Sequence, residues 1–380
     1  MKRMTLKAVI GIAVAVSLAA CMSNDPLQVR KPSRPAIKAP PPADLSKKAG
    51  IEWEILNQAA LKLDREGNYP KAVKVAQEAL EVAKRRVGPN HPDYATSLNN
   101  LAVFLEHLGL YDKAERLHQR ALAIREKTLG PDHPDVANSL NNLGLLYSNQ
   151  GRYDKAEPLH QRALAIREKT LGPDHPDVGQ SLNNLASLYE NQGRYDKAES
   201  LYQRALFIDE KALGPDHPSV ATDLNNLALL NYRLGQYDKA EPLYQRVLSI
   251  NEKALGPNHP NVATSLNNLG SLYDSQGQYD KAEPLYQQAL AIWEKALGPD
   301  HPSVATSLNN LAFLYYRLGR YDKAEPLYQR ALAIVEKSLG SDHPHVVTLL
   351  ENMTVMYQAM NKTKEAEKIK MRIRAIKARQ

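Results

Sequence analysis

The apolar residues of this chain recur with the spacing of amphipathic α-helices, in blocks separated by short turns that contain Gly and Pro. Residues 130–171 form one such block. At 100° per residue, one side of a first helix should face the core, and it carries Leu140, Leu143, Gly144 and Tyr147. The opposite side is polar and nearly uncharged, and it carries Asn138, Asn141, Asn142, Leu145, Ser148 and Asn149. The block predicts a first helix ending near Gln150 and a second helix from about Asp154 to Leu171.

Turn-forming residues mark the ends of these predicted helices. Gly130 can adopt the left-handed conformation that ends the preceding helix. Asp132 and Asp135 are expected to cap the next helix at its positive end, and Pro134 occupies a position where its missing N–H costs nothing. Gly151 then breaks the first helix, so the block predicts a helix–turn–helix unit.

The same unit repeats along most of the chain. A Gly-Pro-Asp-His-Pro turn, or a close variant, begins every 42 residues, at Gly88, Gly130, Gly172, Gly214, Gly256, Gly298 and Gly340. Self-similarity at a fixed period is typical of solenoids, in which each unit packs only against its neighbours.

The repeated residues resemble the tetratricopeptide repeat. The pattern is Leu140-x-x-Leu143-Gly144-x-x-Tyr147 and then Gly151-x-Tyr153-x-x-Ala156, with His160 and Ala163. The 42-residue period is similar to that of the kinesin-light-chain subclass. The resemblance implies an all-α, right-handed superhelical solenoid of about eight antiparallel helix pairs over residues 51–380. The repeats are expected at about 51–88, 93–130, 135–172, 177–214, 219–256, 261–298, 303–340 and 345–380. The divergent first and last pairs are expected to be caps that face water.

Each first helix carries a pair of Asn residues, and the second of each pair forms a series that we call the ladder asparagines. They are Asn100, Asn142, Asn184, Asn226, Asn268, Asn310 and Asn352. In tetratricopeptide proteins the first helices line a concave groove, and similar asparagines bind peptide backbones in relatives. A carboxamide has a donor and an acceptor, so it can bind an extended backbone without reading its sequence. Alternatively, these side chains bond neighbouring helices; the two roles can coexist.

Specificity would have to come from side chains that differ between repeats. The strongest candidates are two Tyr-Arg pairs, Tyr232 with Arg233 and Tyr316 with Arg317. Tyr and Arg are the residue types that most often anchor interfaces. Neutral variation on a solvated face is the alternative interpretation.

Charge and motifs argue against several other functions. The net charge of +7 arises at the two ends of the chain, so the repeats lack the basic face of a nucleic-acid binder. One His recurs in each turn, always followed by Pro, and a structural role is favoured over a metal site. No cofactor, metal or small-molecule substrate is expected. No phosphate-binding loop, nucleophile elbow or metalloprotease motif occurs, so the chain is not predicted to be an enzyme.

The N-terminus has the features of a secretory signal. Lys2, Arg3 and Lys7 precede an apolar segment, residues 8–18, that is too short to span a bilayer. The following Leu-Ala-Ala-Cys resembles the lipobox of bacterial lipoproteins, which implies removal of residues 1–20 and lipidation of Cys21. An ordinary secretory signal is the alternative. Residue 22 is Met rather than Asp, which by the same resemblance favours the outer membrane, facing the periplasm.

The sequence therefore predicts an envelope-anchored scaffold. Residues 21–50 contain six Pro and no apolar periodicity, which indicates an extended, lipidated tether. The favoured function is the binding of an extended peptide or partner protein in the groove. The alternatives are an envelope spacer without a defined ligand and, less favoured, an envelope enzyme.

Overall fold

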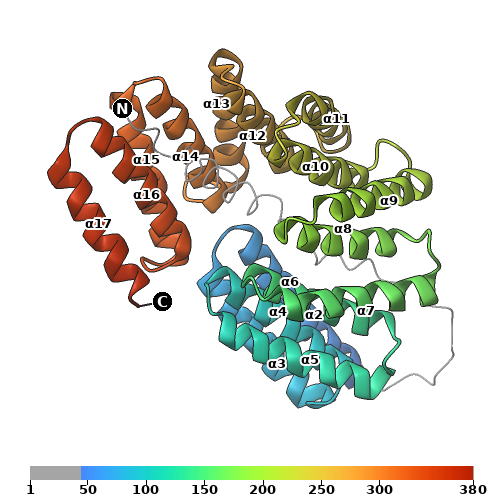
Figure 1. The fold of residues 1–380 in the computed structure, drawn as a ribbon. Helices are drawn as coiled ribbons and strands as arrows, with labels where there is room; N and C mark the ends of the chain where they lie inside the picture. Colours follow the sequence, from blue (N-terminus) through green and yellow to red (C-terminus); the bar gives the residue numbers. More distant parts are fainter. Residues whose placement is uncertain (1–43, 380) are drawn as a thin grey trace. The chain divides into compact units, whose positions relative to one another are not determined.

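A computed structural model describes residues 44–379, and this part of the chain consists of α-helices joined by short turns (Figure 1). The predicted signal peptide and Cys21 lie outside the described residues. The helices are α2 (Asp44–Arg65), α3 (Tyr69–Val87), α4 (Pro92–His107), α5 (Tyr111–Leu129), α6 (Pro134–Asn149), α7 (Tyr153–Leu171), α8 (Pro176–Asn191), α9 (Tyr195–Leu213), α10 (Pro218–Arg233), α11 (Tyr237–Leu255), α12 (Pro260–Ser275), α13 (Tyr279–Leu297), α14 (Pro302–Arg317), α15 (Tyr321–Leu339), α16 (Pro344–Ala359) and α17 (Thr363–Lys377).

The helices belong to two compact units, an N-terminal unit that holds α2 to α7 and a C-terminal unit that holds α8 to α17. Within each unit, every helix packs mainly against the helices that precede and follow it in the sequence. The prediction of an all-α solenoid built from helix pairs is confirmed.

The first helix starts earlier than predicted. Helix α2 begins at Asp44, inside the range 21–50 that was predicted to be tether. The last proline before it is Pro42, and the residues from Ala43 onward are compatible with a helix. The tether prediction therefore ran too far toward the C-terminus, because it followed the average composition and not the position of the last Pro.

Each first helix from α4 to α16 begins with a His N-cap. The imidazole Nδ1 of His133 accepts a hydrogen bond from the backbone N–H of Asp135 at 3.1 Å, and Pro134 occupies the first helical position. The residue before a Pro prefers extended backbone, and His133 has φ −74° and ψ 141°. This geometry aims the imidazole at the free N–H. The predicted capping by Asp132 and Asp135 is wrong, and the structural role predicted for the turn His is confirmed.

The predicted inner face of the first helix is confirmed, but the buried arc is wider than expected. Leu140, Leu143 and Tyr147 are buried as predicted. Asn141 and Ser148, which were placed on the polar side, are buried as well. A first helix is covered by neighbours on more than one side, because it contacts the second helices both before and after it.

Ion pairs between successive second helices line the surface within each unit. Arg162 contacts Glu126, and in the C-terminal unit Arg246 contacts Glu210, both at 2.6 Å. The same spacing of 36 residues recurs between Arg330 and Glu294. These side chains are about one-third exposed or more, so each pair contributes little, about 0–1 kcal/mol. Apolar packing, not these pairs, holds the repeats together.

Candidate functional site on the first helices

The ladder asparagines bond from one repeat to the next. In the C-terminal unit, the Nδ2 atoms of three of them each donate to the first Asn of the preceding repeat's pair. The bonds are Asn268 to Asn225 (2.9 Å), Asn310 to Asn267 (3.0 Å) and Asn352 to Asn309 (2.8 Å). In the N-terminal unit, Asn100 donates to Asn57 at 3.0 Å. At these positions the asparagines bond neighbouring helices, which is the alternative role that the sequence allowed.

The ladder is interrupted at three consecutive repeats. Asn142, Asn184 and Asn226 are half-buried, and the carboxamide of each makes no hydrogen bond to the described residues of its own unit. In the N-terminal unit the cause is visible. The oxygen Oδ1 of Asn99, which would accept from Asn142, lies 2.9 Å from Nδ1 of the buried His118. These three carboxamides remain available to a ligand.

The Arg233 side chain forms an ion pair within the solenoid. Its Nη1 atom lies 2.9 Å from Oε1 of Glu190, one repeat earlier, and both side chains are buried or nearly so. Tyr202 donates a hydrogen bond to Oε2 of the same carboxylate at 3.0 Å. Burial raises the pKa of Glu190, while Arg233 and Tyr202 act in the opposite direction. Arg233 therefore neutralises a buried acid and joins two repeats.

Tyr232 and Arg317 also have partners in the neighbouring repeat. The Tyr232 hydroxyl lies 2.7 Å from Oγ of Ser275. Arg317 donates from Nη1 to the backbone oxygen and to Oδ1 of Asp274, both at 3.0 Å. Burial raises the pKa of Asp274 to about 6 against the opposing effect of Arg317.

Tyr316 differs from the other three candidates. It is half-buried, and its ring lies against Phe313 and Tyr321, with centroid distances of 5.9 and 6.1 Å. All three side chains are only partly buried, so they form an aromatic surface on α14 and α15. Of the predicted anchors, Tyr316 is best placed to contact another molecule.

These contacts share a spacing that was not predicted from the sequence. Glu190 with Arg233 and Asp274 with Arg317 are 43 residues apart, one more than the repeat. The same offset joins Asp64 Oδ1 and His107 Nδ1, at 2.7 Å. A search for an acidic residue and an Arg or His at this offset would have found all three pairs, because adjacent first helices bring such positions together.

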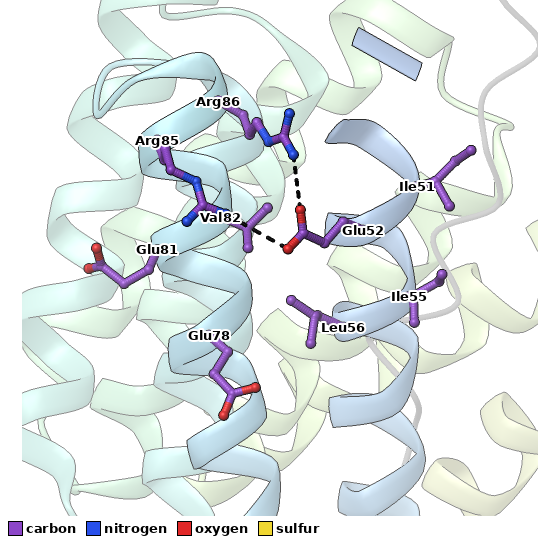
Figure 2. Close-up of a pocket in the computed structure, with 9 residues that line it drawn as sticks. All are labelled: Ile51, Glu52, Ile55, Leu56, Glu78, Glu81, Val82, Arg85 and Arg86. Carbon is purple, nitrogen blue, oxygen red and sulfur yellow. Dashed lines mark hydrogen bonds and ion pairs between the residues drawn. The ribbon is translucent and has the colours of Figure 1, made fainter. Parts of the chain in front are cut away.

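A separate apolar surface lies at the start of the N-terminal unit (Figure 2). Ile51 is 53% exposed and Ile55 is 62% exposed on α2, beside Leu56 and Val82. Glu52, ion-paired with Arg85 and Arg86, closes one end of this groove. The expectation that the first pair is a polar cap is therefore wrong for these positions.

Within residues 44–379, no three His, Cys, Asp or Glu side chains are arranged to hold a metal ion. In the same residues, no helix combines the length and apolar character needed to cross a membrane.

Known proteins resemble the chain through its repeats. A family model described as tetratricopeptide repeat matches seven overlapping segments, residues 54–103, 95–169, 141–211, 177–253, 224–295, 275–337 and 303–379. No curated protein matches the chain.

Solved structures also match. BtubC (BKLC) from P. vanneervenii is 28% identical, over 63% of this chain and 93% of that one, with a TM-score of 0.48. A putative kinesin light chain with TPR-like repeats from Podosopora anserina is 32% identical, over 54% of this chain and 98% of that one, with a TM-score of 0.45. A Rap protein complexed with Competence and Sporulation Factor is 17% identical, over 88% of this chain and 98% of that one. Its TM-score of 0.53 indicates a shared fold.

Proposed function

Because the chain belongs to the tetratricopeptide repeat family, we propose that it is a scaffold that binds an extended peptide or partner protein along its first helices. The family is generally a non-catalytic scaffold for protein–protein interaction. One structural neighbour, the Rap protein, was solved with Competence and Sporulation Factor bound. We further propose that lipid on Cys21 holds the scaffold at a bacterial outer membrane, where it faces the periplasm.

The observation that carries this proposal is the interruption of the ladder. Asn184 and Asn226, on successive first helices of the C-terminal unit, keep both the donor and the acceptor of their carboxamides free within the described residues of that unit. These groups match the N–H and C=O of a peptide backbone. A bound segment would replace water there without breaking any bond of the solenoid.

Other residues of the C-terminal unit favour a ligand with little charge. Glu190 and Asp274 are already neutralised by Arg233 and Arg317. The aromatic surface of Phe313, Tyr316 and Tyr321 offers contact area for an apolar side chain. The preferred ligand is therefore an extended segment with a bulky apolar residue.

A displayed random-peptide library tests this function. A peptide selected on the full-length protein is titrated against wild type, against Asn184→Ala with Asn226→Ala, and against the matched control Asn310→Ala. The two-site variant should bind at least about tenfold more weakly, because each lost hydrogen bond contributes about 0.5–1.5 kcal/mol. Equal affinity in the wild type and the two-site variant would reject the first-helix site.

A spacer function is the second candidate, and the bonded ladder asparagines favour it. Asn100, Asn268, Asn310 and Asn352 use their donors to join repeats, as a purely structural ladder would. A spacer predicts that no peptide is selected above background by the library. That result would reject the scaffold function and favour the spacer.

The anchor is tested separately. Cells that express wild type or Cys21→Ser are labelled with palmitate and fractionated. Wild type should be labelled and membrane-bound, and the variant should lose both properties. Unlabelled protein that stays in the membrane fraction in both forms would contradict lipidation.

A further inference from the structure

Two buried carboxyl groups meet between α9 and α10. Asp209 on α9 is 5% exposed and Asp223 on α10 is 1% exposed. The two side chains are close enough to hydrogen-bond, and this interaction affects the pKa of each. A second helix and the first helix of the next repeat touch at this point. The pair therefore lies at a joint between repeats.

Other repeats place compatible side chains at the same joint. In the N-terminal unit, Arg125 donates to Oγ of Ser139 at 2.9 Å. In the C-terminal unit, Asn251 donates to Oγ of Ser265, also at 2.9 Å. In these pairs one side chain carries an N–H donor and the other carries an acceptor, so no extra proton is needed. Asp209 and Asp223 are both acids, so the pair has a donor only if one of the carboxyl groups keeps its proton.

The surroundings of the pair supply no compensating positive charge. One oxygen of each group, Asp209 Oδ1 and Asp223 Oδ2, is buried without a hydrogen-bond donor in the described chain. The charged neighbours that act on the pair are Asp177 from α8 and Glu210 from α9, and both are acidic. Burial, reinforced by these acids, raises the pKa of Asp209 to about 6 and that of Asp223 to about 8. Two adjacent buried carboxylates cannot both ionise at low cost, so a shared proton is the stable arrangement.

Glycine makes room for the pair. Residue 179 on α8 is Gly, and a Cβ atom there would lie 3.1 Å from Asp209 Oδ1. The same position holds Ala in the repeats on either side, at Ala137 and Ala221. Gly179, in place of Ala, therefore leaves space beside the Asp209 carboxyl group.

The acid pair is also connected to the ladder. Asn183, the first Asn of the pair on α8, donates from Nδ2 to Asp223 Oδ1 at 2.5 Å. Its own Oδ1 is buried and receives no hydrogen bond in the described residues. In the following repeats, the equivalent oxygens of Asn225, Asn267 and Asn309 accept from a ladder asparagine. The bond to Asp223 thus coincides with the ladder gap at Asn226.

We propose that Asp209 and Asp223 form a proton-dependent joint: a shared proton holds α9 against α10, and its loss loosens this joint and alters the ladder at Asn183 and Asn226. Control of a bound peptide by this joint rests on the proposed function, whereas the joint itself does not. The proton is the hydrogen-bond donor that the two carboxyl groups lack.

The direction of the pH effect follows from the raised pKa values. Each carboxyl binds its proton more tightly in the folded joint than in an opened one, where an Asp pKa is about 3.9. The stabilisation is fully present below about pH 4 and is lost as the pH rises through about 6 and then about 8. The opening equilibrium should increase by up to about tenfold per pH unit for each proton released.

Hydrogen exchange of the full-length protein tests the joint. Protection of α9 and α10 amides, corrected for intrinsic exchange, is measured at pH 5.5 and 7.5, with α3 as the internal reference. In wild type, α9 and α10 should lose at least about tenfold more protection than the reference. The variant Asp209→Asn with Asp223→Ser, which reproduces the neutral Asn251–Ser265 pair, should remove this difference and remain folded.

Two outcomes would overturn the proposal. One is an equal pH response of α9–α10 and the reference in wild type. The other is a restoration of α9–α10 protection at pH 7.5 by Ca²⁺, which would assign a cation in place of the proton. Asp223→Asn alone gives a milder check, since it keeps the side-chain shape, and it should also flatten the response.

A peptide titration separates this proposal from the function. The joint regulates the site if the affinity of the library-selected peptide depends on pH in the wild type and does not depend on pH in the double variant. If no peptide is selected but the exchange result holds, the proposed function fails and the joint stands.

Discussion

Asn268 donates a hydrogen bond to Asn225 across 2.9 Å, although the two residues belong to different repeats of the C-terminal unit. Asn226, beside Asn225 in the sequence, makes no such bond in the described chain. The same residue at equivalent positions of similar repeats therefore has different roles, and the difference depends on the residue that faces the first Asn of each pair.

This difference predicts opposite effects of one substitution at two ladder positions. Asn268→Ala removes a nearly buried donor from Asn225 and should lower the free energy of unfolding by about 1–3 kcal/mol. Asn226→Ala removes no hydrogen bond and should change stability by less than about 0.5 kcal/mol. Urea unfolding of both variants measures the difference. A larger loss at Asn226 than at Asn268 would contradict the assigned bonds.

The two arginines should differ in their contribution to stability. Arg233 is 14% exposed and Arg317 is 32% exposed, and each faces a buried acid. Removing one partner of a buried ion pair costs about 3–5 kcal/mol, and solvent reduces that cost at the more exposed site. Arg233→Ala should therefore destabilise the protein more than Arg317→Ala does. Urea midpoints in the reverse order would show that burial does not control these pairs.

Tyr316 is predicted to contribute to binding more than to folding. Its aromatic neighbours leave it half-buried, and an interface hot spot contributes about 2 kcal/mol or more. Tyr316→Ala should weaken the library-selected peptide by about 30-fold while helicity is retained. Tyr232→Ala is the matched comparison, and it should chiefly affect stability, because Tyr232 is buried against Ser275. Unchanged peptide affinity in Tyr316→Ala would exclude it as an anchor.

The repeat itself could be predicted from sequence, because its period and helix signals agree in every copy. The boundaries of α6 and α7 follow from Gly151 and the apolar positions, and the structure places them within one or two residues of the prediction. The predicted N-cap was wrong because Asp is the commoner cap in general, whereas here Pro134 holds His133 in the extended backbone of an N-cap. Local preferences of this kind are weaker than the geometry that a neighbouring Pro imposes.

The candidate site could be predicted only in part. The ladder asparagines were found because they repeat, but their partners lie one repeat away and depend on residues such as His118 and Asp223 that break the repeat. The sequence indicated Tyr232 and Arg233 as variable positions. It did not reveal that Ser275 and Glu190 face them, because that requires the packing of adjacent first helices.

Gly144 should be intolerant of Ala, although Ala is common at its position in other repeats. A Cβ atom there would lie 2.7 Å from Cε1 and 2.8 Å from Nε2 of the buried His160. Overpacking of this kind costs about 1–3 kcal/mol, more than the helix propensity of Ala returns. Gly270→Ala is the control, since its nearest contact with Tyr286 is 3.0 Å. Thermal melting should show a greater loss at Gly144, and an increase in the melting temperature would refute the clash.

The C-terminal pair is predicted to act as a cap through a lysine. Val335 of α15 is buried, and the corresponding position of α17 holds Lys377. This lysine pairs with Glu351 at 2.9 Å, so the last helix presents charge where α15 presents an apolar side chain.

Removal of residues 345–380 should therefore expose Val335 and cause association, because exposed apolar surface drives self-association. Light scattering and sedimentation of the truncated protein measure it. Adding Val335→Lys to the same truncation supplies the charge of the natural end and should restore the monomer. If the simple truncation is as soluble and as stable as the parent, the last pair is not a cap. If both truncations associate equally, other surfaces of α14 and α15 cause the association.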